Sequence, residues 1–421
     1  MDAQAIQTRR AVSAAVIGNV LEWYDFAVYG YVATIIAKNF FPPGNETAAL
    51  LATFATFGIG FLARPLGGIV IGWIGDKYGR KTALLATIFL MAVGTVIIGL
   101  IPTYASIGLL APAILVIARL MQGFSAGGEW GGSTAFIVEW APEGRRGYYG
   151  SFQQMSVVMG LLLGSGTAAL LNTVLDPASM ESWGWRIPFL LGGILGPVGI
   201  WMRRSIDETP AYRKAEAAPL APADDFSSPV VLAARAFGFT ILWTVSFYIF
   251  LAYMPTFTQK YANLSRAAAL WSNTAGLLLL MIAIPVFGYL SDKYGRKPFL
   301  LACCLAFIFL PYPLFSIMLG GASLTTILLI QLLIGLTIAL FSGAGPAAIS
   351  EIFPTRTRST YMSTGYALAV AIFGGFAPFI ATWLIEWTKS PISPVYYVIA
   401  SAIVSAIVIA GLRETAHEPL G

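Results

Sequence analysis

GWIGDKYGRK, at residues 72–81, returns as GYLSDKYGRK at residues 288–297, a displacement of 216 residues. A second pair of segments agrees with the first, because EWAPEGRRG from Glu139 aligns with EIFPTRTRS from Glu351. The chain is therefore predicted to consist of two similar halves. Repeated halves around an axis along the membrane normal can expose one substrate site at their interface to each side of a membrane in turn. The repeat predicts a transporter.

The composition indicates a membrane protein. Of 421 residues, 57% are hydrophobic and 11% are charged, whereas a soluble globular chain has roughly 25% charged residues. The mean hydropathy is +0.76. We expect an all-α protein with twelve transmembrane helices in two pseudo-symmetric six-helix halves. The apolar runs that can cross about 30 Å of hydrocarbon lie at 12–38, 49–75, 82–101, 107–137, 148–173, 186–202, 235–258, 268–291, 298–319, 323–349, 360–386 and 394–412.

Basic residues near the ends of these runs predict the orientation. With both termini in the cytoplasm, eighteen Lys and Arg residues fall on the inner side and five on the outer side. The positive-inside rule therefore predicts a multi-pass protein of a bacterial-type inner membrane with both termini cytoplasmic. The first run is too long for a cleaved signal peptide, and it contains acids. The net charge of +5 requires no nucleic-acid partner, because the basic residues border anionic lipid.

The predicted domains follow from the repeat. Residues 1–202 form the N-terminal six-helix half, residues 203–234 a polar cytoplasmic linker that contains EAAPLAPADD, and residues 235–421 the C-terminal half. The expected partners are a small-molecule substrate, protons and the lipid bilayer, and the expected state is a monomer.

No cofactor or metal is expected, and no enzymatic activity. The adjacent Cys303 and Cys304 form neither a disulfide framework nor a CxxC metal signal, and the single histidine, His417, lies in the C-terminal tail. The sequence contains no GxxxxGK[ST] loop for ATP. The energy source is therefore expected to be an ion gradient, of protons or alternatively of sodium.

Charged residues inside the apolar runs predict the functional site. Glu22 and Asp25 lie within GNVLEWYDFAVYGY at residues 18–31, and Arg64, Arg119 and Glu129 lie in two further runs of the same half. Ionised side chains at membrane depth are costly, so they usually face a polar cavity and serve function. Structural pairing among themselves is the alternative role.

The chain resembles the major facilitator superfamily. The resemblance rests on GxxxDKYGRK after the second run, RLMQG at residues 119–123 and the repeat in the second half. Within that superfamily, GNVLEWYDF, GFLARPLGG, QGFSAGGEWGG and WGWRIPF are similar to motifs of the metabolite/proton symporter family. The resemblance implies carriers of carboxylates, compatible solutes and related metabolites.

The resemblance also implies a cytoplasmic gate that stabilises the outward-facing state. Simple loop charges of the positive-inside kind are the alternative role. The residues of this gate are Asp76, Arg80, Glu139, Arg146, Asp292, Arg296, Glu351 and Arg358.

The proposed roles at the site follow from residue chemistry. The proton carrier is expected among Asp25, Glu129 and Glu22, in that order, with Arg119 competing with the proton for the same carboxylate. Arg64 is the preferred partner of a substrate carboxylate, because a guanidinium donates two parallel hydrogen bonds. The resemblance also leaves Arg119 as a possible substrate contact. The other expected substrate contacts are Gln122, Tyr29, Tyr248, Tyr253 and Asn273.

The predicted function is proton-coupled symport that imports a small organic acid, a di- or tricarboxylate such as citrate or ketoglutarate. The alternative substrate is a zwitterionic compatible solute such as proline or betaine. The chain ends with RETAHEPLG just after its last run, which argues against an osmosensor with a C-terminal coiled coil. A proton-driven exporter and a non-transporting receptor are further alternatives; Arg64 and Arg119 argue against the large apolar cavity of such an exporter, and a receptor would not require intramembrane carboxylates.

Overall fold

The computed structural model describes residues 16, 19–78, 80–128, 130, 134, 137–138, 141–204, 229–352 and 358–418. Regular structure in these ranges is helical throughout, and they contain no strand, which confirms the all-α prediction. The predicted linker at 203–234 lies mostly outside these ranges, so its boundaries and those of the two halves stay predictions.

The described part of the N-terminal half contains six helical rods. The first runs through residues 19–31 and continues as α2. The elements that follow residue 31 are α2 (Ala33–Phe40), α3 (Glu46–Leu62), α4 (Arg64–Tyr78), α5 (Arg80–Leu100), α6 (Tyr104–Ile107), α7 (Leu110–Ser125), η1 (Ala126–Gly128), α9 (Arg146–Val174), α10 (Pro177–Ser182), η2 (Gly184–Arg186) and α11 (Ile187–Arg204).

The described part of the C-terminal half contains six more rods. Two of them include a π-helical segment, η3 and η4, in which the backbone hydrogen bonds join residues five apart instead of the four of an α-helix. The elements are α13 (Pro229–Phe247), η3 (Tyr248–Tyr253), α14 (Met254–Tyr261), α15 (Arg266–Tyr294), α16 (Lys297–Phe309), α17 (Pro311–Leu319), α18 (Leu324–Glu351), α19 (Arg358–Ala369), η4 (Val370–Gly374), α20 (Ala377–Thr388) and α21 (Pro394–Ala410).

The twelve rods coincide with the twelve predicted runs. By length and composition, six described helices can cross a membrane, or seven when α16 and α17, bent by 43°, count as one span. The others are shorter or interrupted. Side-chain caps begin several of them, since Asn45, Ser265 and Ser323 each accept a hydrogen bond from the backbone N–H three residues later.

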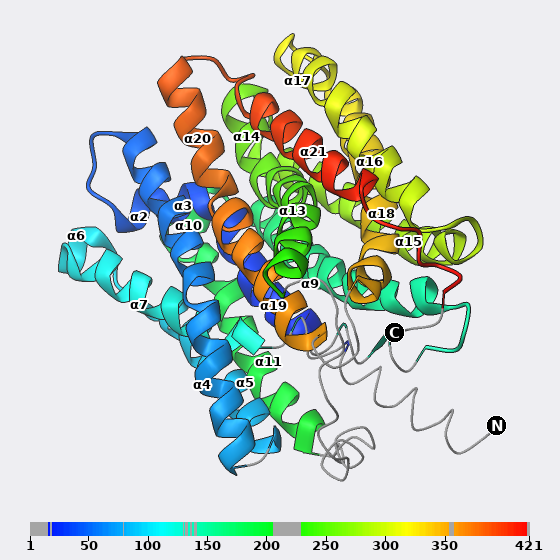
Figure 1. Cartoon of the computed structure of the whole chain (residues 1–421). Helices are drawn as coiled ribbons and strands as arrows, with labels where there is room; N and C mark the ends of the chain where they lie inside the picture. Colours follow the sequence, from blue (N-terminus) through cyan, green and yellow to red (C-terminus); the bar gives the residue numbers. More distant parts are fainter. Residues whose placement is uncertain are drawn as a thin grey trace.

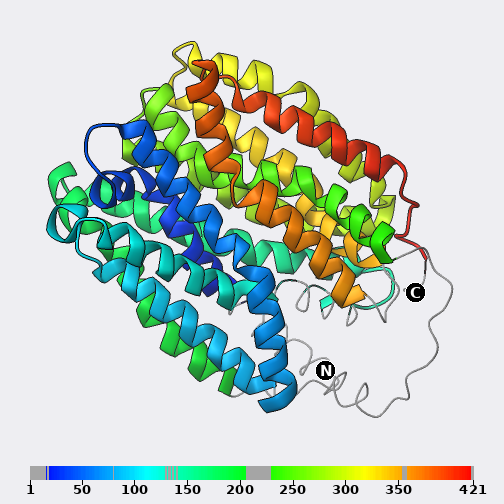
Figure 2. The same ribbon diagram turned by 60° about the vertical axis from the view of Figure 1, so that its left-hand side comes forward.

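The two halves lie side by side in the ribbon (Figure 1), with the N-terminal helices from blue through cyan to the green of α11 and the C-terminal helices from the brighter green of α13 to red. A second view shows the same division (Figure 2), and α9 packs against α15 along the boundary. Glycine permits the closest approaches. A Cβ at Gly123 would overlap the carbonyl of Gly60, and a Cβ at Gly147 would crowd the carbonyl of Gly288.

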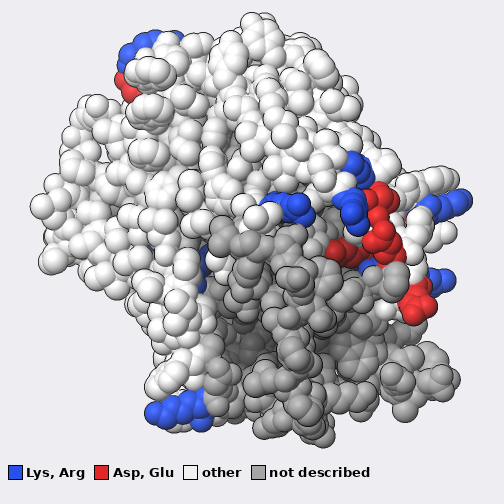
Figure 3. Space-filling model, in the orientation of Figure 1, with Lys and Arg blue, Asp and Glu red and all other residues white. Residues whose placement is uncertain are grey.

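The surface is divided as a bilayer requires. In Figure 3 most of the described residues on this face are uncharged, and the Lys, Arg, Asp and Glu residues among them gather mainly where α15 and α21 end. Large apolar side chains such as Leu66, Ile69, Phe309 and Ile407 are exposed. We call the end with residues 72–81 and 288–297 the motif end, and the opposite end the far end.

Candidate substrate and proton site

Arg64 begins α4 directly after the break at Ala63, and its side chain is only 5% exposed. Its guanidinium carbon lies over three rings, 4.4 Å from the centroid of Phe61, 5.0 Å from Phe26 and 5.6 Å from Trp23. Among the described residues, none lies within hydrogen-bonding distance of its Nε and Nη2. One edge of a buried guanidinium is therefore available to a ligand, and its geometry suits a carboxylate.

Arg119, on α7, is fully buried and already has partners. It donates hydrogen bonds to Gln122 Oε1 at 2.9 Å and to the carbonyl of Phe57 at 3.3 Å. Its guanidinium carbon lies 4.5 Å from the ring centroid of Tyr29. The hydroxyl of Tyr29 donates to the carbonyl of Thr53 at 3.0 Å. Arg119, Gln122 and Tyr29 therefore form one packed group, and the polar atoms named here already have hydrogen-bond partners within the protein.

Asp25 lies on the first helix and is 5% exposed. Its Oδ2 accepts a hydrogen bond from Thr95 Oγ1 at 2.9 Å, and Thr95 Oγ1 accepts one from Gln122 Nε2 at 2.8 Å. Since Gln122 also accepts from Arg119, Asp25 and Arg119 are joined through two side chains. Thr95 and Gln122 lie between the two groups in this structure, and the expected competition of Arg119 with the proton for the carboxylate stays a prediction.

Glu22 is partly buried on the same helix. It is close enough to Tyr248 and Tyr366 of the other half to interact with them electrostatically. Arg64 interacts electrostatically with the same two tyrosines. The i, i+3 spacing thus separates the two acids, since Glu22 faces the interface between halves and Asp25 contacts α5 and α11. Glu129, the other proposed proton carrier, lies outside the described residues.

Tyr248 begins the π-helical segment η3 and packs across the interface between the halves. Its ring centroid lies 5.2 Å from Phe61, 6.1 Å from Phe57 and 6.5 Å from Trp23. Within the described part of the chain, no hydrogen-bond partner reaches its hydroxyl. Tyr248 and Arg64 therefore share ring neighbours, as expected for two residues of one site.

Tyr253 and Asn273 belong to a second group. Thr382 Oγ1 lies 3.4 Å from the Tyr253 hydroxyl, and Asn273 Nδ2 donates to the carbonyl of Leu251 at 3.3 Å and to Ser165 Oγ at 3.2 Å. The Leu251 carbonyl also accepts from the Tyr31 hydroxyl at 3.0 Å. No contact links either residue to Arg64, and the predicted substrate role of both is untested.

An aromatic cluster that the sequence analysis did not single out joins the halves. Trp130 stacks on Tyr366 with ring centroids 3.4 Å apart and planes within 2°. Trp243 meets both rings edge-on, at 5.9 Å from Trp130 and 6.1 Å from Tyr366. In the sequence, Trp130 directly follows Glu129 in the stretch EWGG. This pairing of an aromatic residue with an acid inside an apolar run was the feature that could have indicated Trp130.

Asp292 joins the two halves at the motif end. Its carboxylate accepts hydrogen bonds from the backbone N–H of Gly147 at 2.7 Å and of Tyr148 at 2.8 Å, at the first turn of α9. An acid at a helix N-terminus is favoured by the macrodipole. Arg296 Nη1 lies 2.7 Å from Asp292 Oδ1. The acid of the second DKYGRK copy therefore contacts the other half.

Glu351 is the centre of the same contact. Arg146 of the N-terminal half and Arg296 of the C-terminal half reach its Oε1 at 3.2 and 3.3 Å. Thr415 Oγ1 donates to its Oε2 at 2.6 Å. Arg146, Asp292, Arg296 and Glu351 thus form one network. The other predicted gate side chains, Asp76, Arg80, Glu139 and Arg358, lie outside the described part of the structure.

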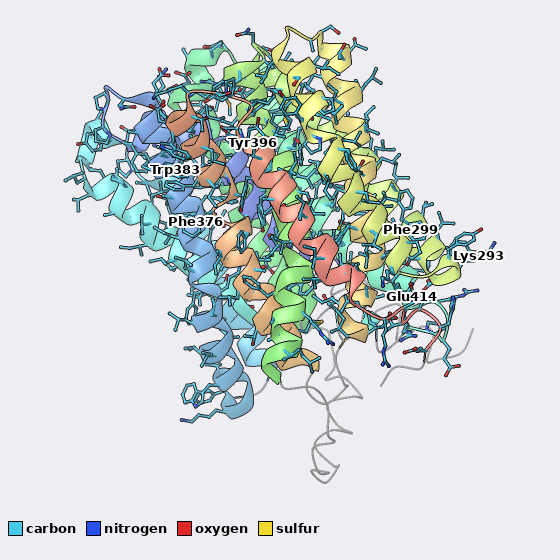
Figure 4. All side chains as sticks on the ribbon, turned by 45° about the horizontal axis from the view of Figure 1, so that its top comes forward. Lys293, Phe299, Phe376, Trp383, Tyr396 and Glu414 are labelled. Atoms are coloured by element: carbon cyan, nitrogen blue, oxygen red, sulfur yellow. The ribbon has the colours of Figure 1, made fainter. Side chains whose placement is uncertain are left out.

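The C-terminal tail adds to this network. Glu414 accepts hydrogen bonds from the backbone N–H of Arg296 and Lys297, each at 2.9 Å, at the start of α16. Burial raises the pKa of Glu414, but these bonds and those from Ala416 and Thr415 outweigh it and leave the pKa below its usual value. Figure 4 shows Glu414 and Lys293 at the same corner, where the C-terminal ribbon passes the turn between α15 and α16.

An ion-pair cluster joins the halves at the far end. Glu181 of α10 pairs with Lys38 of the first rod at 2.5 Å and with Arg266 of α15 at 2.7 Å. Partial burial raises the pKa of Glu181, but the hydrogen bonds and charges of Lys38 and Arg266 outweigh this and lower it overall. Nearby, Trp271 Nε1 donates to Thr173 Oγ1 at 3.0 Å. Both ends of the molecule thus carry polar contacts between halves.

A chain with two six-helix halves, an apolar belt and a charged buried site between the halves is a membrane transporter. Comparisons with known proteins place it more closely. The family model described as sugar (and other) transporter matches residues 11–218, and that of the major facilitator superfamily matches residues 260–420. The proline/betaine transporter of Escherichia coli K12 is 35% identical over 98% of this chain and 85% of its own length. The citrate-proton symporter of Klebsiella pneumoniae is 39% identical over 93% and 89%.

The chain therefore belongs to the major facilitator superfamily, and within it to the group that contains these proline/betaine and citrate carriers. The fold agrees. An inward open structure of the xylose transporter XylE from E. coli matches 98% of this chain and 98% of its own, with a TM-score of 0.78 and 19% identity. This likeness establishes the fold alone. The resemblance proposed from the motifs is confirmed.

Proposed function

We propose that this protein imports a small zwitterion, of the proline or betaine class, together with protons. The observation that carries the proposal is the free edge of Arg64, buried among rings at the interface between the halves. In this role, Arg64 holds the substrate carboxylate with Nε and Nη2.

The charge of the site suits one carboxylate better than three. Among the described residues of the membrane region, Arg64 and Arg119 are the guanidinium groups beside this aromatic cluster, and both Nη atoms of Arg119 already donate to protein. Only Arg64 has a whole edge available. A tricarboxylate would therefore bring more negative charge than the site can pair.

The ammonium group of a zwitterion also has partners here. The faces and edges of Trp23, Tyr248, Trp130, Trp243 and Tyr366 surround this part of the interface. Aromatic faces attract quaternary and secondary ammonium groups through their quadrupoles. Glu22, which interacts electrostatically with two of these rings, adds negative charge.

The relatives support this substrate class better than the di- or tricarboxylate expected from the sequence, since several of them are named proline/betaine transporters. A tricarboxylate is the second candidate, because the citrate-proton symporter has the higher identity, 39%.

In the proposed cycle, Asp25 carries the proton. The contacts at the motif end and at the far end break and re-form as the site opens to either side, with the motif end cytoplasmic. The network of Arg146, Asp292, Arg296 and Glu351 stabilises the state that is closed to the cytoplasm.

Uptake into proteoliposomes under an imposed inward proton gradient tests the proposal. Glycine betaine, proline, citrate, ketoglutarate and succinate are compared in one assay, with Arg64→Gln as the site variant and Arg413→Gln, in the exposed tail, as control. We expect gradient-driven uptake of betaine or proline, reduced about tenfold or more in Arg64→Gln because a charge-assisted hydrogen bond is lost. Accumulation of citrate without betaine or proline would reverse the substrate class. No accumulation of any of the five would contradict the function.

A further inference from the structure

Thr95 occupies a position between the proposed proton carrier and the buried arginine. Its hydroxyl lies within hydrogen-bonding distance of two acceptors, Asp25 Oδ2 at 2.9 Å and the carbonyl of Met91 at 3.0 Å. A hydroxyl has one proton, so it can donate to only one of them at a time. Both acceptors lie at ordinary distances, and the choice between them is open to the hydroxyl rotor.

The third partner of Thr95 is fixed. Gln122 Nε2 donates to Thr95 Oγ1 at 2.8 Å, and Gln122 Oε1 accepts from Arg119 at 2.9 Å. Arginine can only donate, so the amide of Gln122 must present its oxygen to Arg119 and its NH₂ group to Thr95. The direction of these hydrogen bonds is therefore set from Arg119 to Thr95.

The state of Asp25 then decides which acceptor Thr95 uses. When Asp25 is a carboxylate, its Oδ2 can only accept, and Thr95 donates to it. When Asp25 has bound a proton on Oδ2, that O–H donates to Thr95 Oγ1, and Thr95 donates to Met91. One proton is bound and later released as H⁺, and no other covalent bond changes.

The surroundings of Asp25 leave it few other partners. Among the described residues, none donates to its Oδ1, which lies against Gly192 of α11 so closely that a Cβ there would overlap it. The other titratable group that faces it is Tyr24, which donates its hydroxyl to the carbonyl of Pro188 at 3.0 Å.

We propose that Thr95 is the coupling residue of this transporter, a two-position switch between Asp25 and Gln122. The hydrogen bond that Thr95 Oγ1 accepts from Gln122 keeps its direction in both positions, but its strength changes, because a hydroxyl that donates to a carboxylate is the more strongly polarised acceptor. The protonation of Asp25 is thereby transmitted through Gln122 to Arg119. This inference rests on the proposed function for the identity of the ion. Thr95 is a positioning residue, since it acts through other groups and does not contact the substrate. Arg119 packs against Phe26, a ring that also lies beside Arg64, so the switch connects the proton to the substrate region.

The test separates coupling from transport. Thr95→Val keeps the shape of the side chain and removes the hydroxyl, and Thr95→Ser restores it. Thr240→Val is the matched control, because Thr240 is equally buried and its hydroxyl donates only to the carbonyl of Ala236, four residues earlier. Each variant is reconstituted as the full chain and assayed with the solute that the wild type accumulates among the five.

We expect proton-gradient-driven accumulation by Thr95→Val to fall by about tenfold, because a buried network loses its central member. Its substrate counterflow, which needs no net proton movement, should stay within about twofold of wild type, as should both activities of Thr95→Ser and Thr240→Val. The pH dependence of uptake should flatten in Thr95→Val alone. Full accumulation and an unchanged pH profile in Thr95→Val would overturn the proposal, and so would equal losses in Thr95→Ser.

A wild type that accumulates none of the five solutes would contradict the proposed function, and the switch is then tested by proton binding alone. Detergent-solubilised wild type is titrated against Asp25→Asn to isolate the proton bound by Asp25. The midpoint of that titration should shift in Thr95→Val and stay in place in Thr95→Ser. Equal midpoints in all three Thr95 forms would overturn the proposal.

Discussion

The carboxylate of Asp292, at the end of α15, accepts a hydrogen bond of 2.7 Å from the backbone N–H of Gly147, at the start of α9 in the other half. Through this contact, the second copy of the DKYGRK motif forms a hydrogen bond between the two halves. It also defines which substitutions should change the balance of conformations.

Asp292→Asn should open the motif end more often. An asparagine retains the shape, but its NH₂ group would face a backbone donor, and a buried charge-assisted hydrogen bond contributes about 1.5–3 kcal/mol. Ser151 is buried at this interface, so the probe is Ser151→Cys. We expect this cysteine to react with a membrane-permeant maleimide about tenfold faster in Asp292→Asn than in the otherwise wild-type chain. The background carries Cys303→Ser and Cys304→Ser. Lys293→Ala, an exposed neighbour, should leave the rate unchanged, and an unchanged rate in Asp292→Asn would remove Asp292 from the gate.

Glu414→Gln should loosen the start of α16. The carboxylate of Glu414 holds the N–H groups of Arg296 and Lys297, and its pKa is lowered, so it stays ionised at neutral pH. The stabilisation is present above the unfolded pKa and is lost only as pH falls through the lowered folded value. Hydrogen exchange of a peptide that covers these two residues should accelerate in Glu414→Gln. Glu418→Gln serves as control, because the described hydrogen bonds of Glu418 involve its backbone: its carbonyl accepts from Arg146 and its N–H donates to the carbonyl of Thr415.

Wild-type protection of that peptide, after correction for the intrinsic rate, should be the same at any two values near neutral pH. A protection that already declines with mild acidification would contradict the lowered pKa of Glu414.

Glu181→Gln should open the far end. Glu181 joins Lys38 to Arg266 across the halves, whereas Glu386 pairs with Lys389 within one half at the same end. Partly exposed ion pairs contribute about 0.2–1 kcal/mol each. With Ser165→Cys as the probe, which lies against Thr274 of the other half, we expect maleimide labelling to increase about two- to fivefold in Glu181→Gln. Glu386→Gln should have no effect. Equal labelling in both variants would leave the Glu181 cluster without a role in closure.

The lowered pKa of Glu181 gives the sign of its pH dependence. Its ion pairs persist above the usual glutamate range and weaken only as pH falls through the lowered value. Labelling at position 165 should therefore not rise under mild acidification of the outer solution.

Gly123→Ala should impair folding. A Cβ at Gly123 would overlap the carbonyl of Gly60, a backbone atom that cannot move aside, whereas a Cβ at Gly166 would have only Thr274 Cγ2 within 4.0 Å. We expect the Tm of Gly123→Ala to fall by several degrees or its yield of folded protein to collapse, because overpacking costs about 1–3 kcal/mol. Gly166→Ala should match wild type. Equal Tm values in the two variants would show that α3 and α7 can separate without cost.

Part of the site was predictable because charge is conspicuous in an apolar run. Asp25, Arg64 and Arg119 stand out for that reason, and the structure buries all three. The apolar runs likewise predicted twelve rods, and the repeat predicted their division into two halves. Thr95 and Gly192 could not be predicted, since a single small residue in an apolar helix usually serves packing. Their importance depends on which helices become neighbours.

Backbone details were equally beyond the sequence. The run at 49–75 was expected as one helix, and Glu46–Ile71 does form one span. The sequence did not indicate the one-residue irregularity at Ala63, directly before Arg64. The π-helical segment from Tyr248 to Tyr253 leaves the Leu251 carbonyl open to Tyr31 and Asn273. Such choices follow from packing between halves, which composition and spacing do not report.

The central claim is that Asp25 couples a proton to substrate import. The most direct measurement compares Asp25→Asn with wild type in proteoliposomes, for accumulation under an inward proton gradient and for substrate counterflow in its absence. We expect Asp25→Asn to lose accumulation above equilibrium and to retain counterflow. Accumulation equal to wild type in Asp25→Asn would contradict the claim and assign the proton to another group.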